Sequence, residues 1–384
     1  MCQRKNRRKS FIKRKLSQQR LGGYHKMSES NDTNLHIKAT LLAEGLIRVT
    51  KETLDFAKSS DRKLGRILTD LRNLYSSPWL FFLIDSKIRA RMIIDPEEKC
   101  EFELLPSRSD GDKYIIVDRK ANVITEVAIE DSLYHCPDQI FYNLYTWCSN
   151  DCAFCPLAKA KPRSRDTVST MVKVANSFDK TEVKAIGVTT GIPSHLSSTK
   201  LIDEMVKAVE TLRKTVGAKI PIGVSPYACS RNDILQLYSA GANEIRINLE
   251  TYNPQLHELL CPNKNLNQIL VSLESAVDIF GKNHVSSNMI LGLGEDDEDM
   301  KNGLIGLCNR GVIPTVYPLD PIPAKMEIIR NRSDVFASRP KKDRLLHIAY
   351  LHRDALISSG LDPTQLKTMC PACTASHIMP GFDL

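Results

Sequence analysis

Three cysteines lie close together in the segment Tyr145–Pro156, whose sequence is YTWCSNDCAFCP. Cys148, Cys152 and Cys155 have the spacing C-x3-C-x2-C and follow the apolar run Ile140–Tyr145, which predicts a strand. Thiolates this close in sequence can bind one soft metal centre without ligands from distant parts of the chain. Three ligands leave one iron of a four-iron cluster, or one position of a zinc ion, free for another molecule. The segment therefore predicts a metal centre with an open coordination position.

These cysteines could also form a structural zinc site or be three unrelated core thiols. A structural zinc site needs a fourth ligand at a short spacing, and the next cysteine after Cys155 is Cys229. The chain has 11 cysteines and lacks the apolar core of a secretory signal. This combination favours reduced thiols and metal binding over a disulfide framework. We therefore expect a cytoplasmic protein that binds a metal centre through its thiols.

The positive charge of the chain is concentrated at its start. Residues 1–26 contain ten Lys or Arg and no Asp or Glu, and without them 43 basic residues stand against 45 acidic ones. The rest of the chain therefore lacks the excess positive charge of a nucleic-acid-binding surface. We expect residues 1–27 to be a disordered tail: a nucleic-acid arm, an organelle presequence or an extension upstream of a true start at Met27. No apolar run approaches the ~20 residues of a membrane span, so no membrane contact is expected.

The order of apolar residues divides the remaining chain into two regions. Residues 28–135 are expected to form an N-terminal α+β accessory region, with helix over 35–75 and strands within 79–93 and 113–127. After residue 136, further strands are predicted at 141–146, 184–190, 219–226, 243–249, 285–291 and 312–318. Helices are predicted at 166–178, 198–215, 231–240, 266–280, 296–309 and 341–358. Six βα units in succession predict parallel strands covered by helices, with chemistry at the carboxyl ends of the strands.

Distinctive segments follow four of these strands. They are Thr190-Gly191 after the second, Arg246–Thr251 after the fourth, Gly292-Leu293-Gly294-Glu295 after the fifth, and a proline-rich stretch ending at Lys325 after the sixth. On a strand, Arg246, Asn248 and Glu250 share one face. Polar side chains in a buried strand are costly unless they meet a ligand or each other. Each segment also has an ordinary explanation. Gly191 can be a turn glycine, and residues 246–251 can be a solvated edge strand. The acids after Gly294 can simply suit a helix N-terminus, and Lys325 can be a solvated lysine instead of a substrate contact.

In this order and at these strand ends, the motifs resemble those of the radical S-adenosylmethionine (SAM) superfamily, especially biotin synthase and lipoyl synthase. In that superfamily three cysteines hold a [4Fe–4S] cluster whose free iron binds SAM, and one electron cleaves SAM to methionine and a 5′-deoxyadenosyl radical. The resemblance implies that Cys148, Cys152 and Cys155 hold this cluster and act in SAM cleavage. It implies SAM contacts at Thr190, Gly191, Asn248, Glu250, Gly292 and Gly294. It covers about residues 140–330.

The resemblance implies an α/β fold, with a partial (β/α)6 barrel over residues 136–360 and a C-terminal extension over 361–384. It also implies a sulfurtransferase that removes hydrogen from an unactivated carbon and inserts sulfur, with an octanoyl chain on a carrier protein as the preferred substrate. A divergent or two-component lipoyl synthase would use a reductant such as ferredoxin or flavodoxin and a second radical SAM subunit. The alternatives are a radical SAM enzyme of cofactor or amino-acid assembly, which needs no sulfide donor, and a zinc-stabilised adaptor.

The C-terminal extension contains a second group of cysteines. Cys370 and Cys373 form a C-x2-C pair, followed by Ser376 and His377. Such a pair is half of a metal site. We expect an auxiliary iron–sulfur cluster completed by Cys136, Ser376 or His377, with a redox pair or a small zinc site as alternatives. A second cluster of the biotin synthase kind is not expected, because its cysteines have no counterparts here. The cysteines expected to be ordinary thiols are Cys2, Cys100, Cys229, Cys261 and Cys308.

Overall fold

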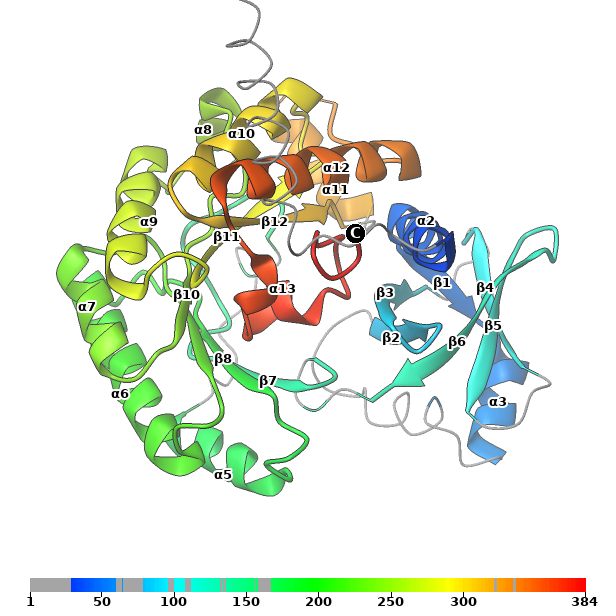
Figure 1. The fold of residues 1–384 in the computed structure, drawn as a ribbon, viewed down its shortest axis with the longest axis horizontal. Helices are drawn as coiled ribbons and strands as arrows, with labels where there is room; N and C mark the ends of the chain where they lie inside the picture. Colours follow the sequence, from blue (N-terminus) through cyan, green and yellow to red (C-terminus); the bar gives the residue numbers. More distant parts are fainter. Residues whose placement is uncertain are drawn as a thin grey trace, which may run out of the picture.

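The computed structural model describes residues 29–59, 64, 79–95, 100–107, 112–131, 133, 136–155, 157, 167–320, 323–333 and 336–384. The predicted basic tail, residues 1–27, lies outside the described residues. Two β-structures with separate hydrophobic cores make up the described part: a closed barrel within residues 46–130 and an open parallel sheet within 139–318 (Figure 1).

The N-terminal barrel has the strand order β1-β3-β2-β6-β5-β4 and is closed by parallel pairing of β1 with β4. Its strands are β1 (Leu46–Val49), β2 (Trp79–Ile84), β3 (Ile88–Ile94), β4 (Phe102–Pro106), β5 (Lys113–Asp118) and β6 (Val123–Glu130). Helices α2 (Glu29–Glu44) and α3 (Lys51–Ser59) flank β1 in the chain. Closure leaves no unpaired edge strand, which would otherwise be open to pairing with another chain.

The continuous helix predicted over residues 35–75 is wrong, because β1 interrupts it. Gly45 follows the last turn of α2 with φ +70°, a left-handed conformation that favours glycine and ends helices. The chain then pairs with β3 on one side and β4 on the other. Both partner strands come later in the sequence, so local periodicity does not reveal this strand. The strands predicted within 79–93 and 113–127 are confirmed, β4 was missed, and most of 60–75 lies outside the described residues.

The second sheet is parallel throughout, and its strands follow one another in chain order. They are β7 (Gln139–Asn143), β8 (Ala185–Thr189), β9 (Ile222–Ser225), β10 (Glu244–Arg246), β11 (Val285–Leu291) and β12 (Ile313–Pro318). The helices on its outer side are α5 (Val168–Ser177), α6 (Ser198–Val216), α7 (Arg231–Ser239), α9 (Leu266–Phe280), α10 (Asp297–Asn309) and α12 (Lys342–Ser359) (Figure 1). This arrangement confirms the predicted α/β partial barrel, with each predicted strand and helix in place. The short helices α8 (Pro254–Leu260) and α11 (Pro323–Ser333) were not predicted.

The C-terminal segment turns back into the space enclosed by the parallel sheet, where helix α13 (Met369–Cys373) packs on β7 and β8 (Figure 1). Glycines make room for it. Gly187 of β8 stands opposite Gly223 of β9, and a Cβ atom at Gly223 would overlap the hydroxyl of Thr368. The carboxylate of Glu244 accepts hydrogen bonds from the backbone N–H and the hydroxyl of Thr368, at 3.0 and 2.6 Å. The segment is therefore part of the barrel interior. None of the described helices is both long and apolar enough to cross a bilayer.

Lys38 of α2 forms a buried ion pair with Asp383. Its Nζ lies 2.7 Å from each carboxylate oxygen and donates a further hydrogen bond to the carbonyl oxygen of Thr374 at 2.9 Å. The two side chains are 0% and 2% exposed. Burial lowers the pKa of Lys38 and raises the pKa of Asp383, because desolvation disfavours the charged form of each group. The ammonium group thus has three acceptors. Because Lys38 lies in α2 and Asp383 in the C-terminal segment, the ion pair joins the accessory region to that segment.

Replacing Lys38 by Met should destabilise the protein by about 3–5 kcal/mol, because the carboxylate of Asp383 would stay buried without its cation. The double variant Lys38→Met/Asp383→Asn should recover part of this loss, since it buries no charge. Urea unfolding of the full chain measures both values. A double variant as unstable as the single one would show that the ion pair is not the cause.

Candidate active site

Cys148, Cys152 and Cys155 lie in the loop after β7, at the carboxyl edge of the parallel sheet. The neighbouring strand end holds this loop. The N–H of Gly191 donates to the carbonyl oxygen of Tyr145 at 2.8 Å, and the N–H of Ser149 donates to that of Ile192 at 2.8 Å. A Cβ atom at position 191 would overlap the carbonyl oxygen of Trp147. This close backbone approach is the physical reason for glycine here, and the loop is anchored before any ligand binds.

A side chain from distant sequence fixes the middle of the same loop. Arg332 of α11 donates to the carbonyl oxygen of Asp151 at 2.6 Å and to its two carboxylate oxygens at 2.9 and 2.8 Å. Asp151 has φ 49°, a left-handed conformation that costs ~1–3 kcal/mol in residues other than glycine. The arginine offsets this cost. Nothing in the local sequence indicates this contact, because α11 itself was not predicted.

The thiol of Cys261, which was expected to be an ordinary thiol, lies beside the cysteine loop. It donates a hydrogen bond to Cys152, which lowers the pKa of Cys152 and raises that of Cys261. Burial raises the pKa of Cys155 to about 11. Within the described ranges, no three His, Cys, Asp or Glu side chains lie close enough to hold a single metal ion. The thiolates of a cubane bind different irons, so they are spaced more widely than the ligands of one ion.

Glu250 lies next to this loop and has a basic partner that the sequence did not indicate. Its carboxylate forms an ion pair with Lys264 at 3.0 Å, and both side chains are 10% exposed. Burial alone would lower the pKa of Lys264, but the negative charges of Glu250 and Cys152 raise it. Glu250 also has φ 73°. A strained backbone and a buried ion pair beside the cysteines are typical of functional sites.

The other predicted SAM contacts have defined structural roles. The hydroxyl of Thr190 donates to the carbonyl oxygen of Gly191 at 2.6 Å, within the turn that anchors the loop. Gly292 and Gly294 have φ 111° and 117°, and the carboxylate of Glu295 accepts the N–H groups of residues 292 and 293 at 2.7 Å each. These glycines therefore form a turn that its own acid stabilises. Their contacts with SAM stay predictions, and the side chain of Lys325 lies outside the described residues.

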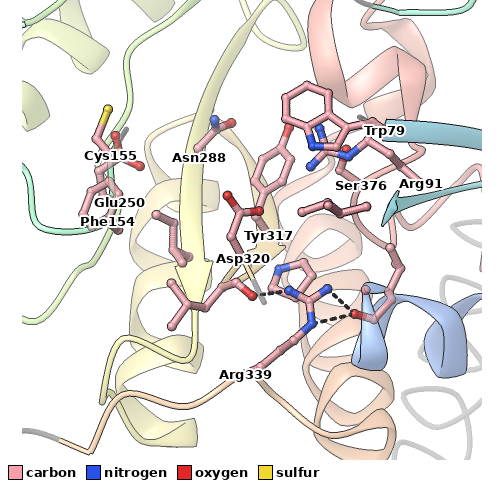
Figure 2. A pocket seen from close by; sticks show the side chains of 16 residues that line it. Trp79, Arg91, Phe154, Cys155, Glu250, Asn288, Tyr317, Asp320, Arg339 and Ser376 are labelled. Atoms are coloured by element: carbon pink, nitrogen blue, oxygen red, sulfur yellow. Dashed lines mark hydrogen bonds between the residues drawn. The ribbon is translucent and has the colours of Figure 1, made fainter. Parts of the chain in front are cut away.

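A cavity of about 300 Å³ begins at the cysteine loop. Figure 2 shows Phe154, Cys155 and Glu250 on one side of it and Trp79, Arg91 and Ser376 on the other. Trp79 and Arg91 belong to strands β2 and β3, so the N-terminal barrel forms one wall. This volume is at the lower end of the range for ligand pockets, ~300–1,000 Å³. The accessory region is therefore part of the site and not a separate module.

The wall opposite the cysteine loop is held in place by Arg339. Its guanidinium donates to the carbonyl oxygens of Leu42 and Ala43, in the last turn of α2, and to that of Leu319 after β12 (Figure 2). Burial lowers the pKa of Arg339 to about 10. A cation suits the carbonyl end of a helix. Arg339 therefore joins the end of α2 to the segment after β12 at the edge of the cavity.

Buried polar atoms without hydrogen-bond partners occur just after β10 and within β11 and β12. They are Oδ1 of Asn248, Oδ1 of Asn288 and Oγ1 of Thr315. Asn288 lines the cavity and stands opposite Thr315 in the register of β11 and β12. Buried polar groups in native proteins usually have partners. These atoms are therefore candidates for contacts with a bound molecule, and Asn248 was among the predicted SAM contacts.

Residues 142–303 match the family model of the radical SAM superfamily. The chain carries a radical SAM domain. This assignment implies a [4Fe–4S] cluster and SAM as cofactors. The anchored loop with its three thiols, open to a cavity at Cys155, fits such a cluster.

Curated relatives of the chain are named lipoyl synthase. That of Leptospira biflexa serovar Patoc is 30% identical over 175 residues, 43% of this chain and 53% of that protein. That of Buchnera aphidicola subsp. Schizaphis graminum is 25% identical over 177 residues, 45% of this chain and 53% of that protein. The chain thus spans about half the length of these relatives.

Solved structures similar to the chain have several different names. Methylornithine synthase has a TM-score of 0.44 at 18% identity, covering 62% of this chain and 69% of that one. A radical SAM methyltransferase from Sphaerobacter thermophilus has a TM-score of 0.45 at 16% identity, covering 66% and 74%. SuiB of Streptococcus suis, solved with SAM, has a TM-score of 0.45 at 12% identity, covering 59% and 49%.

The predicted pair Cys370 and Cys373 lies on α13, inside the parallel sheet, and Cys136 packs beside it. Of the predicted additional ligands, Ser376 lines the cavity. His377 is buried, its ring centroid lies 4.9 Å from that of Tyr317, and neither ring nitrogen has a hydrogen-bond partner. The structure thus brings Cys136, Cys370 and Cys373 together. A cluster at this position stays a prediction.

Replacing Gly191 by Ala should displace the cysteine loop, because the added methyl group would overlap the backbone of Trp147. We expect most of the cluster iron to be lost after anaerobic reconstitution, as measured by iron and sulfide analysis. Gly360→Ala is the control: it also adds a methyl group, at the end of α12, where a Cβ atom meets nothing within 4 Å, and its left-handed backbone accepts alanine at a cost of roughly 1–2 kcal/mol. Equal iron in both variants would contradict the role of the close approach.

Proposed function

We propose that this radical SAM enzyme inserts sulfur into an unactivated C–H bond, and that its substrate is an octanoyl chain on a carrier-protein lysine. The chain would then be a divergent or two-component lipoyl synthase, a sulfurtransferase of the cytoplasm. One observation carries this proposal: the cavity that begins at Cys155 also reaches Tyr317 and Ser376, next to Cys370 and Cys373 of α13. The names of the curated relatives support it.

Residues on the cysteine-loop side of the cavity have a proposed role in the cleavage of SAM. Cys148, Cys152 and Cys155 would hold a [4Fe–4S] cluster, which would supply the electron that cleaves SAM. We propose that Glu250, which lines the cavity, and Asn248, whose Oδ1 is buried without a hydrogen-bond partner, accept hydrogen bonds from the polar groups of SAM. In each insertion the hydrogen of one C–H bond goes to the 5′-deoxyadenosyl radical, which becomes 5′-deoxyadenosine, and the carbon radical that remains forms one C–S bond. The sulfur would come from a sulfide of an iron–sulfur cluster held by Cys370 and Cys373, whose Fe–S bonds break and whose iron takes up the electron left over. An external reductant such as ferredoxin or flavodoxin supplies the electron for cleavage.

The apolar lining of the cavity suits an acyl chain. Phe154, Ile290 and Leu319 come from the radical SAM barrel, Leu42 comes from α2, and Ile93 comes from the N-terminal barrel. Each methylene group moved from water to such a lining contributes about 0.8 kcal/mol. The accessory region therefore has a proposed role in binding the substrate, and a carrier protein and a second radical SAM subunit are its proposed partners.

Cys148→Ala should lose the SAM-cleaving cluster and release no 5′-deoxyadenosine, because Cys148 is one of three ligands. Cys261→Ala is the control: it removes a thiol that touches Cys152 but is not in the loop motif. It should keep its iron and its SAM cleavage. Anaerobic purification, iron analysis and chromatography of SAM products measure both. If Cys261→Ala lost its iron while Cys148→Ala kept its own, the assignment of the cluster ligands would be wrong.

Incubation of the wild type with SAM, dithionite and an octanoyl-lysine peptide should give a peptide that has gained sulfur, seen by mass spectrometry. The variant Cys370→Ala/Cys373→Ala should still release 5′-deoxyadenosine but should give no thiolated peptide. Release of 5′-deoxyadenosine by the wild type without thiolation would favour the alternative, a radical SAM enzyme of cofactor or amino-acid assembly that inserts no sulfur.

A further inference from the structure

Three cysteines from opposite ends of the radical SAM region meet inside the barrel. Cys136 precedes β7, while Cys370 and Cys373 lie on α13, and the three share one small cluster of side chains. The thiol of Cys136 donates a hydrogen bond to that of Cys373. Cys136 and Cys373 are 3% and 6% exposed. Other apolar side chains could fill these positions between the sheet and α13. Packing alone therefore does not explain why three thiols lie together here.

A buried cation faces the same cysteines. Arg246 of β10 is 7% exposed, donates to the hydroxyl of Ser225 at 3.3 Å and donates to Sγ of Cys370 at 3.3 Å. Among the residues that the structure describes, none of the carboxylates forms an ion pair with it. Burying a guanidinium group without an anion is costly. A thiolate is a far better acceptor for it than a thiol, so the geometry suits negatively charged sulfur at Cys370.

Two further side chains border the three cysteines. The ammonium group of Lys38 donates to the carbonyl oxygen of Thr374, next to Cys373, and Asp383 is its carboxylate partner. On the other side, Tyr317 contacts Cys370 and also lines the cavity that begins at the cysteine loop. The side chain of Tyr317 thus lies between the cysteine cluster and the cavity.

We propose that Cys136, Cys370 and Cys373 hold a second iron–sulfur cluster inside the barrel, with Arg246 as the buried cation that offsets its negative charge. Three thiolates and a neighbouring cation fit such a cluster, which carries net negative charge and is held by thiolates. Part of the thiol set, Cys370 and Cys373, is the C-x2-C pair of the sequence, and Cys136 and Arg246 complete the site. The proposal deepens the proposed sulfur-inserting function. It rests on that function for what the second cluster does, but not for whether the cluster is present.

Iron analysis tests the proposal without any assay of activity. The variant Cys148→Ala/Cys152→Ala/Cys155→Ala, purified anaerobically as the full chain and reconstituted with iron and sulfide, should still hold one cluster by iron count and Mössbauer spectroscopy. Adding Cys136→Ala, or Cys136→Ser, should remove most of this iron. Adding Cys308→Ala instead is the matched control, since Cys308 is also a buried thiol but lies on α10. It should leave the iron unchanged.

Several results would overturn the proposal. One is a triple variant without iron; another is full retention of iron after Cys136 is replaced. A stoichiometric zinc ion, or a Cys136–Cys373 disulfide in the anaerobically purified protein, would also do so. Circular dichroism of each variant checks that it is folded. None of these results depends on SAM cleavage or thiolation, so failure of the proposed function is distinguishable from failure of the second cluster.

The midpoint potential of the remaining cluster tests the role of Arg246 as a positioning and charge-compensating residue. Arg246→Met in the triple variant should shift the potential to more negative values, because a cation favours the more negatively charged reduced cluster. Arg246→Lys keeps the charge and should restore most of the difference. Redox titration followed by electron paramagnetic resonance measures the shift. Equal potentials in the Met and Lys variants would show that the arginine does not compensate the cluster.

Discussion

The packing of the C-terminal segment inside the parallel sheet is the constraint on which the rest of the structure depends. Lys38 and Asp383 join it to α2, and the paired glycines of β8 and β9 leave room for it. A parallel sheet that curves only part of the way round leaves an interior that must be filled. Here the chain fills it with its own end. Because that end also contains Cys370 and Cys373, a packing solution places thiols inside the barrel.

The cavity exists because three separate parts of the chain meet at it. The cysteine loop forms one side, the C-terminal segment and β12 form another, and the N-terminal barrel forms the third (Figure 2). Arg339 joins α2 to the end of β12 through backbone carbonyls, so the barrel wall is fixed relative to the sheet. The accessory region thereby gains a role that its own sequence did not suggest.

Much of the site was predictable because its signals are local. The spacing of Cys148, Cys152 and Cys155 marks the cysteine loop, and alternation of apolar runs with helical stretches predicts the six parallel strands. The contacts that hold the loop were not predictable. Arg332, Lys264 and Cys261 come from segments whose own sequence resembles ordinary surface or core, and only their approach to the loop shows what they do. The strand β1 was missed for the same reason, since its partners come later in the chain.

The sequence by itself determined the radical SAM domain, the order of its strands and helices, and the cysteines of its loop, because each depends on residues close together in the chain. Only the tertiary structure decided which distant residues share a site. Cys136 and Cys373 are separated by most of the radical SAM region, yet they are hydrogen-bonded, and Arg246 faces Cys370 with no carboxylate partner among the described residues. Such contacts depend on how a closed barrel, a curved sheet and a returning C-terminal segment pack together, and no local pattern records that.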